Sequence, residues 1–352
     1  MNHKETLFFI AKCLTISLED KKRDKIELVL KTTDLDWDAV VKVSTAHYVF
    51  PALYCNFKRA GFLKYLPVDL VNYMKYITNL NRSRNKQIIT QAQEINTLLL
   101  NNNITPIFLK GTGNLLEGLY DDIGERMVGD IDFLISKKDS YRAFEILKDN
   151  NYYTPENLLN NPPDHRHFPR LVKQENIAAV EIHKELTIEK YSDEFNFKFI
   201  SEDTQSKNNF MVLSFENQLS LSIISSQIND YGFDLKVFSL RNAYDVFLLS
   251  KITHTQKAIS KFTKLKNPLN CFLASCNLVF GDSESLRFFK TKELENYLKA
   301  FNKTFYSSKF NLEVNFKFIK IYLTRIFNIL RRAIFNSEYR TWLFKRIKSI
   351  YF

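Results

Sequence analysis

The stretch from residue 104 to residue 135 constrains the fold of this 352-residue chain more than any other stretch, because two carboxylates follow a glycine-rich segment in it. Asp130 and Asp132 stand at alternate positions at the start of its closing apolar run, directly after Gly129. Alternate side chains of a strand point to the same face of a sheet. Two carboxylates that project together from one strand are typical of a site for a hard divalent cation with oxygen ligands.

The first half of the stretch predicts a strand, a turn and a helix. Ile104–Leu109 is a short apolar run ended by glycine, as in a buried strand. Gly111-Thr112-Gly113 predicts a tight turn that lets a ligand approach the backbone. Asn114–Tyr120 predicts a short helix whose N-terminal N–H groups favour an anion such as phosphate, and Lys110 would reach the same anion. Phosphoryl or nucleotidyl transfer requires such a phosphate cradle beside metal-binding carboxylates.

These residues resemble the uncharacterised nucleotidyltransferase family of bacteria, part of the DNA polymerase β-like nucleotidyltransferase superfamily. The superfamily pattern is a strand, a glycine turn, a helix, an Asp-x-Asp strand and a third acidic strand. The chain departs from it at Thr112, where a small residue is usual, and in its longer spacing from Gly111 to Asp130. The resemblance extends from about Trp37 to about Leu249. The residues that carry it are Leu109, Lys110, Gly111, Tyr120, Arg126 and the run Gly129-Asp130-Ile131-Asp132.

The run Ile177–His183 is where the third acidic strand is expected. Glu181 would complete a three-carboxylate set with Asp130 and Asp132, and His183 would lie on the same face of its strand as Glu181. The alternative is that Glu181 faces solvent on an edge strand. The apolar remainder of the run favours the first interpretation, since a buried carboxylate without a partner is costly.

The polar segment 150–176 contains four prolines and predicts a long loop, and loops of this length in compact domains are often functional. It carries His165 and His167 on either side of Arg166. Such a pair is able to ligate a metal or contact a nucleotide, although two solvated side chains are the commoner interpretation. We therefore treat His165, His167 and His183 as candidate accessory residues.

The rest of the chain predicts helices, so the expected fold is α+β: a small mixed sheet with helices on one face, flanked by N-terminal and C-terminal helical regions. Arg241 and Asp245 stand four residues apart on one predicted helix, where an ordinary ion pair is the default and a place in a cleft is the alternative. The polar segment 201–209 predicts a linker. The predicted divisions are an N-terminal helical region (1–103), a nucleotidyltransferase core (104–200), a helical domain (210–311) and a basic amphipathic tail (312–352).

Composition and the N-terminal sequence predict a cytoplasmic protein. No signal peptide precedes the first amphipathic run, and no window reaches a charge-free transmembrane length. Four cysteines lack metal-site spacing and are expected to be reduced core residues. They are Cys13, Cys55, Cys271 and Cys276. The alternative location is peripheral, at the inner membrane.

The tail, residues 312–352, combines positive charge with an apolar stripe. It holds nine basic and two acidic residues, which supply seven of the chain's eleven net positive charges. The members of the apolar stripe are Phe316, Ile319, Leu323, Ile326, Phe327, Leu330 and Ile334. An anionic membrane surface and packing on the protein's own core explain such a helix equally well. Nucleic acid is a weaker third choice, because no recognised binding motif accompanies the charge.

The resemblance implies a metal-dependent nucleotidyltransferase that moves a nucleoside monophosphate from an NTP, expected to be ATP, to an unidentified acceptor hydroxyl. Asp130, Asp132 and Glu181 would hold Mg²⁺ or Mn²⁺, with Glu181 as a ligand or as the base for the hydroxyl. The triphosphate would lie on Lys110 and the segment Gly111-Thr112-Gly113, with Arg126 steadying its charge. The alternative is a catalytically degenerate nucleotide-binding or scaffolding protein of a membrane-associated biosynthetic pathway. Retention of all three carboxylates favours the enzyme.

Overall fold

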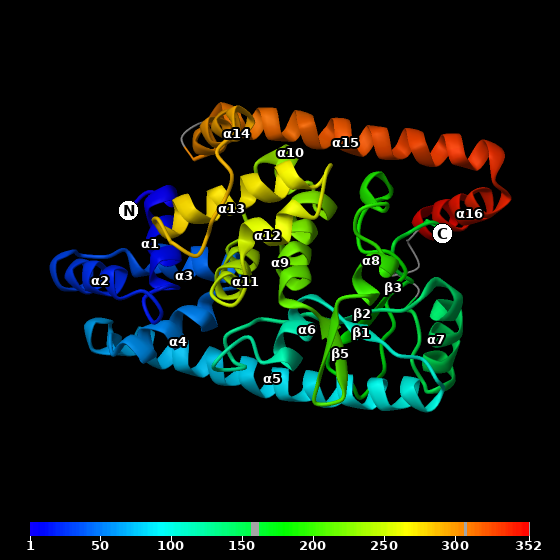
Figure 1. The fold of residues 1–352 in the computed structure, drawn as a ribbon, viewed down its shortest axis with the longest axis horizontal. Helices are drawn as coiled ribbons and strands as arrows, with labels where there is room; N and C mark the ends of the chain where they lie inside the picture. Colours follow the sequence, from blue (N-terminus) through cyan, green and yellow to red (C-terminus); the bar gives the residue numbers. More distant parts are fainter. Residues whose placement is uncertain (156–161, 306–307, 352) are drawn as a thin grey trace.

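A five-stranded mixed sheet lies at the centre of the fold (Figure 1). The computed structural model describes residues 1–155, 162–305 and 308–351, with side chains for all of these except 308–313 and 348–351. The strand order is β3-β2-β1-β5-β4. β1 (Ile107–Phe108) pairs antiparallel with β2 (Asp130–Leu134), which pairs parallel with β3 (Ala179–His183). All three predicted strands therefore form one small sheet, and the predicted α+β class is confirmed.

The segment predicted to be a linker is instead part of the sheet. β4 (Thr204–Lys207) and β5 (Phe210–Leu213) form an antiparallel hairpin, and β5 pairs parallel with β1. Its turn residues Asn208 and Asn209 have φ angles of +48° and +67°, which asparagine tolerates in two-residue hairpin turns. The linker prediction is wrong because this edge strand is polar and carries no apolar alternation.

The predicted glycine turn is also wrong, because helix α6 (Lys110–Glu117) already begins at Lys110. Gly111 and Gly113 lie in its first turn. A Cβ atom on Gly113 would lie 2.7 Å from the carbonyl oxygen of Phe108. Glycine here allows α6 to approach β1 closely, so the glycines position the helix rather than forming a loop.

Helix α5 (Val68–Asn101) is 34 residues long and runs along one side of the molecule (Figure 1). The Gln91 side chain exchanges hydrogen bonds with the backbone of Ala178, beside β3, and Asn96 donates to the carbonyl of Asn209 in the hairpin turn. α5 also contacts α6 and α7 (Lys137–Asp149), which contact β2 and β3. These helices cover one face of the sheet and leave the other for the carboxylates.

Further helices flank the sheet at both ends of the sequence, as predicted. The N-terminal ones are α1 (His3–Cys13), α2 (Asp20–Thr32), α3 (Trp37–Ala46), α4 (Phe50–Ala60) and the 3₁₀ turn Leu63–Tyr65. After β3 come the 3₁₀ turn Glu189–Tyr191, α8 (Phe197–Ser201), α9 (Phe215–Ile224), the π-helical turn Ser225–Asn229, α10 (Gly232–Leu235), α11 (Leu240–Ser250), α12 (Thr255–Ser260), α13 (Lys266–Phe280) and α14 (Lys292–Lys303). Apolar side chains from Leu7 to Phe301 form one continuous core, which contains all four cysteines as free thiols. The predicted domain divisions stay predictions.

The tail forms two helices, α15 (Ser308–Phe335) and α16 (Ser337–Tyr351). Figure 1 shows α15 crossing the molecule on the side opposite α5. Tyr339 and Ala333 are buried, and Arg332 forms ion pairs with Asp164 and Glu189. These contacts fasten the junction of the two helices to the core. Among the described residues, no helix is both long enough and apolar enough to cross a bilayer.

Candidate active site

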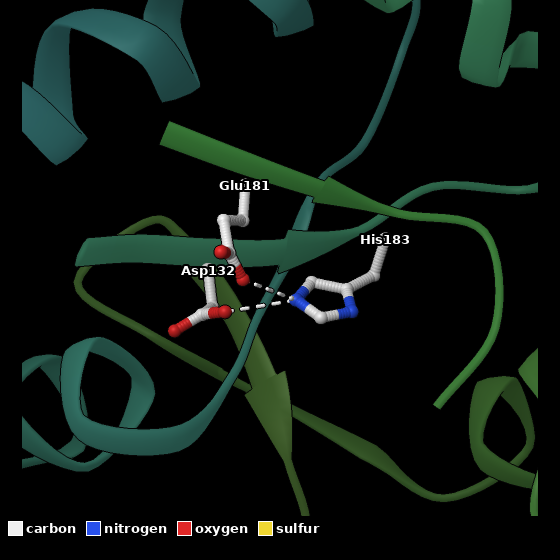
Figure 2. Close-up of side chains that lie close together, drawn as sticks. All are labelled: Asp132, Glu181 and His183. Atoms are coloured by element: carbon white, nitrogen blue, oxygen red, sulfur yellow. Dashed lines mark hydrogen bonds and ion pairs between the residues drawn. The ribbon is translucent and has the colours of Figure 1, made fainter. Parts of the chain in front are cut away.

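Two strands bring a buried Asp, Glu and His together (Figure 2). Asp132 of β2 lies directly opposite Glu181 of β3 in parallel register, and their exposed fractions are only 7% and 6%. His183, two residues after Glu181, places its Nε2 atom 2.8 Å from Asp132 Oδ1 and 3.5 Å from Glu181 Oε2. The ligand atoms of all three residues lie within 4.8 Å of one another. The predicted third acidic strand therefore places Glu181 beside Asp132, and Glu181 does not face solvent.

Asp130 lies beside this cluster, at the more open end of β2. Its Oδ2 atom accepts a hydrogen bond of 2.8 Å from Arg170, whose Nε donates to Glu181 Oε1 at 2.6 Å. Burial raises the pKa of Asp130 to about 6. The negative charges of Asp132 and Glu181 also raise this pKa, whereas the positive charge of Arg170 lowers it. Arg170 thus bridges two of the three predicted metal-binding carboxylates.

Lys110 turns inward to the same carboxylates. Its φ of +52° is unusual for a residue other than glycine, and it directs the side chain from the strand–helix junction towards the cluster. Its Nζ atom donates to Asp132 Oδ1 at 2.6 Å and lies 3.8 Å from Glu181 Oε2. Burial opposes ionisation of Glu181, yet the hydrogen bond from His183 and the charge of Lys110 leave its pKa well below the usual range.

The donor set fits a divalent cation. The carboxylates of Asp132 and Glu181 offer the oxygen ligands that Mg²⁺ and Mn²⁺ prefer, and the imidazole of His183 suits Mn²⁺ better than Mg²⁺. Buried carboxylates need nearby positive charge, which Lys110 and Arg170 supply. The side chain of Lys110 is 26% exposed and that of Arg170 is 44% exposed, so both can move away from the carboxylates into solvent.

A cavity of about 370 Å³, here called the site cavity, lies in front of the cluster. Its volume falls in the usual range for small-molecule sites, about 300–1,000 Å³. Its lining combines the carboxylates with five basic side chains. These are Lys110, Arg126, Arg166, Arg170 and Arg241. Carboxylate oxygens and cationic side chains thus share one cavity.

Arg126 is committed to a buried ion pair. Its Nη2 donates to Asp245 Oδ2 at 2.8 Å and its Nε to Asp245 Oδ1 at 3.0 Å, and Tyr120 donates to the same carboxylate at 2.7 Å. The predicted ion pair between Arg241 and Asp245 is wrong, because Arg126, distant in sequence, takes the carboxylate. Arg126 therefore joins α11 to the site, and its contact with a triphosphate stays a prediction.

The predicted phosphate turn divides into two parts. Gly111 lines the site cavity with Lys110. Thr112 is fully buried, and its Oγ1 donates to the carbonyl oxygen of Asp130 at 2.9 Å. Thr112 holds the start of β2, and Gly113 lets α6 approach β1, so both act on the site through the backbone.

The three candidate histidines form a row beside the carboxylates. The ring centroids of His165 and His167 are 4.2 Å apart, and those of His167 and His183 are 5.2 Å apart. Burial lowers the pKa of His165 to about 3 and that of His167 to about 4. His167 Nδ1 lies 2.7 Å from the carbonyl oxygen of Phe168, a donor contact that leaves Nε2 unprotonated, 3.9 Å from Glu181. The interpretation of His165 and His167 as merely solvated side chains is wrong.

The wall of the site cavity that holds Arg241 was predicted only as the alternative place of Arg241 and Asp245 in a cleft. The Nε of Arg241, the Oγ of Ser225 and the Oδ1 of Asn229 are buried there without a hydrogen-bond partner in the described part of the chain. Burial and the charge of Arg126 lower the pKa of Arg241. Ser225 and Asn229 bound a π-helical turn, a feature frequent at functional sites. The four-residue spacing of Arg241 and Asp245 was the one signal for this wall.

The family model described as an uncharacterised nucleotidyltransferase matches residues 33–280, more than half of the chain. The matched region contains the sheet, the carboxylates, the histidine row and Arg241. No curated protein and no solved structure matches the chain.

Proposed function

The chain belongs to the uncharacterised nucleotidyltransferase family, and from this premise we propose that it transfers a nucleoside monophosphate from an NTP to an acceptor hydroxyl. The observation that carries the proposal is the direct opposition of Asp132 and Glu181 on neighbouring parallel strands, with Asp130 two residues before Asp132 on β2. Arginines and a lysine surround these carboxylates in one cavity. Metal-assisted phosphoryl chemistry needs this combination of charges.

Asp130, Asp132 and Glu181 would hold Mg²⁺ or Mn²⁺, with His183 beside them. A bound divalent ion would neutralise the charge that builds up on the phosphate oxygens. Lys110 and Arg170 now neutralise the carboxylates. With a metal on the carboxylates, both side chains would be free to bind the phosphates.

Arg241 is the residue best placed to meet the triphosphate. Its guanidinium lines the site cavity and has a buried Nε without a partner among the described atoms, whereas Arg126 is already bound to Asp245. A half-buried cation without an ion pair is costly, and an anionic ligand lowers that cost. With Lys110 and Arg170 it forms a three-sided set of donors for an NTP, which we take to be ATP.

The transfer requires a base for the acceptor hydroxyl. The acceptor oxygen bonds to the α-phosphorus, the bond from the α-phosphorus to the leaving oxygen breaks, and pyrophosphate departs. Glu181 serves as a metal ligand or receives the hydroxyl proton. The Nε2 atom of His167 lies 3.9 Å from Glu181, where it is placed to accept that proton from Glu181.

Incubation with α-labelled NTPs, Mg²⁺ or Mn²⁺ and a cell lysate tests the activity. Label should pass to an acceptor with the native protein and not with Asp132→Asn, whose Mn²⁺ binding should also be lost in a calorimetric titration. The alternative, a degenerate nucleotide-binding protein, is favoured by the occupation of the carboxylates by Lys110 and Arg170. It predicts nucleotide binding without transfer and equal titrations for native protein and Asp132→Asn.

We also propose that the apolar stripe of α15 contacts an anionic membrane surface. All seven of its side chains are exposed, from 36% at Ile326 to 71% at Phe316. The opposite face of α15, with Ile329 and Arg332, is turned towards the core. The stripe is therefore not covered by the described part of the protein, which supports lipid contact over the packing alternative.

A further inference from the structure

We infer that a second cavity, between α15 and the core, binds the acceptor, and that the acceptor is a phosphate-bearing compound with a free hydroxyl. The inference rests on the proposed function and names the substrate class of the second half-site. This tail cavity has a volume of about 1050 Å³. Residues 162–166 and 184–192 contribute to its core side, and the inner face of α15 forms its other side.

The two cavities adjoin. Arg166 and Asn229 line both of them, and the histidine row runs from one to the other. His165 lies in the wall of the tail cavity, while His167 lies in the wall of the site cavity, next to Glu181. An acceptor in the tail cavity would thus present its hydroxyl to the α-phosphate from the side of the proposed base. In-line displacement needs the acceptor and the pyrophosphate on opposite sides of the phosphorus.

The charges in the wall select an anion. Its carboxylates are already paired, Asp164 and Glu189 with Arg332 and Glu185 with Lys137. Four basic side chains of the wall form no ion pair within the described residues. These are Arg166, Lys184, Lys320 and Arg325. The surplus is positive and comes from three separate parts of the chain.

Two of these cations have donors left for a ligand. Arg166 has a buried Nε atom without a hydrogen-bond partner among the described residues. Lys184 is half-buried, and its Nζ makes one long hydrogen bond of 3.5 Å, to the carbonyl oxygen of Pro163, and lies 4.9 Å from the Phe168 ring centroid. Arginine and lysine together are the usual ligands of phosphate, which arginine binds through two parallel hydrogen bonds.

The wall formed by α15 is held in place rather than loosely apposed. Arg332 and the Tyr339 hydroxyl both bond Asp164, at 2.6 Å and 3.0 Å. Arg325 and His165 line the same tail cavity from its two sides. The tail therefore completes a binding site for the acceptor.

The probe is glycerol phosphate, which carries a phosphate and free hydroxyls, offered in solution and as the head group of phosphatidylglycerol vesicles. Calorimetry should show binding to the native protein, weakened about tenfold or more by Arg325→Gln and by Lys184→Gln. Arg331→Gln removes the same charge from the same helix outside the cavity and should bind as the native protein does. If the source is lipid, only the vesicles bind, and Arg325→Gln weakens sedimentation with them more than Arg331→Gln.

The inference is overturned if neither form of the probe binds, or if Arg325→Gln and Arg331→Gln behave alike in both arms. Lys184→Gln decides the question if Arg325→Gln fails to fold, as judged by circular dichroism. A parallel titration with ATP and Mn²⁺ separates this result from the proposed function. ATP should bind the Arg325→Gln variant as it binds the native protein. If ATP binds neither protein, the proposed nucleotidyl transfer is contradicted, but the proposed phosphate site in the tail cavity is not.

Discussion

At the scale of single residues, three cations of the site cavity play three different parts. Lys110 neutralises Asp132, Arg126 is locked to Asp245, and Arg241 is half-buried and forms no ion pair with the described residues. Their positive charge is the same, but their partners decide which of them is available to a phosphate. Each part implies a different response to substitution.

The same substitution should separate Arg126 from Arg241. Arg126→Gln leaves a buried carboxylate unpaired and should lower the free energy of unfolding by about 3–5 kcal/mol. Arg241→Gln should change stability by less than about 1 kcal/mol. It should weaken ATP binding about tenfold or more, since a charge-assisted contact contributes about 1.5–3 kcal/mol. Urea unfolding and ATP titration of both variants are the measurements; a stable Arg126→Gln protein would contradict the structural role.

Asp130 should destabilise the metal-free protein. Its pKa is raised to about 6 by burial, from an ordinary value near 3.9 in the unfolded chain. The folded state therefore keeps a proton that the unfolded state releases, and stability falls as pH rises from about 4 to 6. With chelator present, Asp130→Asn should be more stable than the native protein above pH 6, by about 1 kcal/mol after solvent screening, and equally stable below pH 4. A difference that persists at pH 3.5 would point to another cause.

At the scale of elements, the site depends on how closely α6 lies on β1. The backbone of Phe108 occupies the space that a side chain on Gly113 would need, and backbone cannot yield as a flexible side chain can. A shift of α6 would carry Lys110 away from Asp132. The packing of one helix thus sets the position of a charge.

Gly113→Ala should therefore destabilise the protein by about 1–3 kcal/mol, the usual cost of overpacking. Gly129→Ala is the matched control, because a Cβ there meets nothing within 4 Å. Thermal unfolding of the two variants compares them directly. Equal melting temperatures would mean that α6 adjusts without cost.

At the scale of the whole molecule, the strands that carry acidic residues could be predicted because each is a short apolar run with carboxylates on one face. The exposed strand β4 is polar, so nothing in its pattern distinguished it from a linker. The pairing of Arg126 with Asp245 joins residues 119 positions apart, and no local spacing announces such a contact. The inward direction of Lys110 follows from one backbone angle, and the tail cavity exists only because α15 returns across the core.

The exposed stripe of α15 gives the molecule an apolar face, and Lys317 and Arg331 are exposed on the same helix outside the tail cavity. Attraction to anionic lipid contributes about 1 kcal/mol per basic residue near the surface and is screened by salt. Full-length protein should therefore sediment with anionic vesicles at low salt and be released at high salt. Leu323→Ser with Phe327→Ser should weaken this binding without unfolding the chain, since both side chains are more than half exposed.

A double substitution at Ile321 and Ile329, on the inner face of the same helix, is the control. Ile321→Ser with Ile329→Ser removes apolar atoms that line the tail cavity and leaves the stripe complete. Vesicle binding should survive in this variant, while its melting temperature falls. If the two double variants lose vesicle binding equally, or if the native protein stays in the supernatant at low salt, the stripe does not contact lipid.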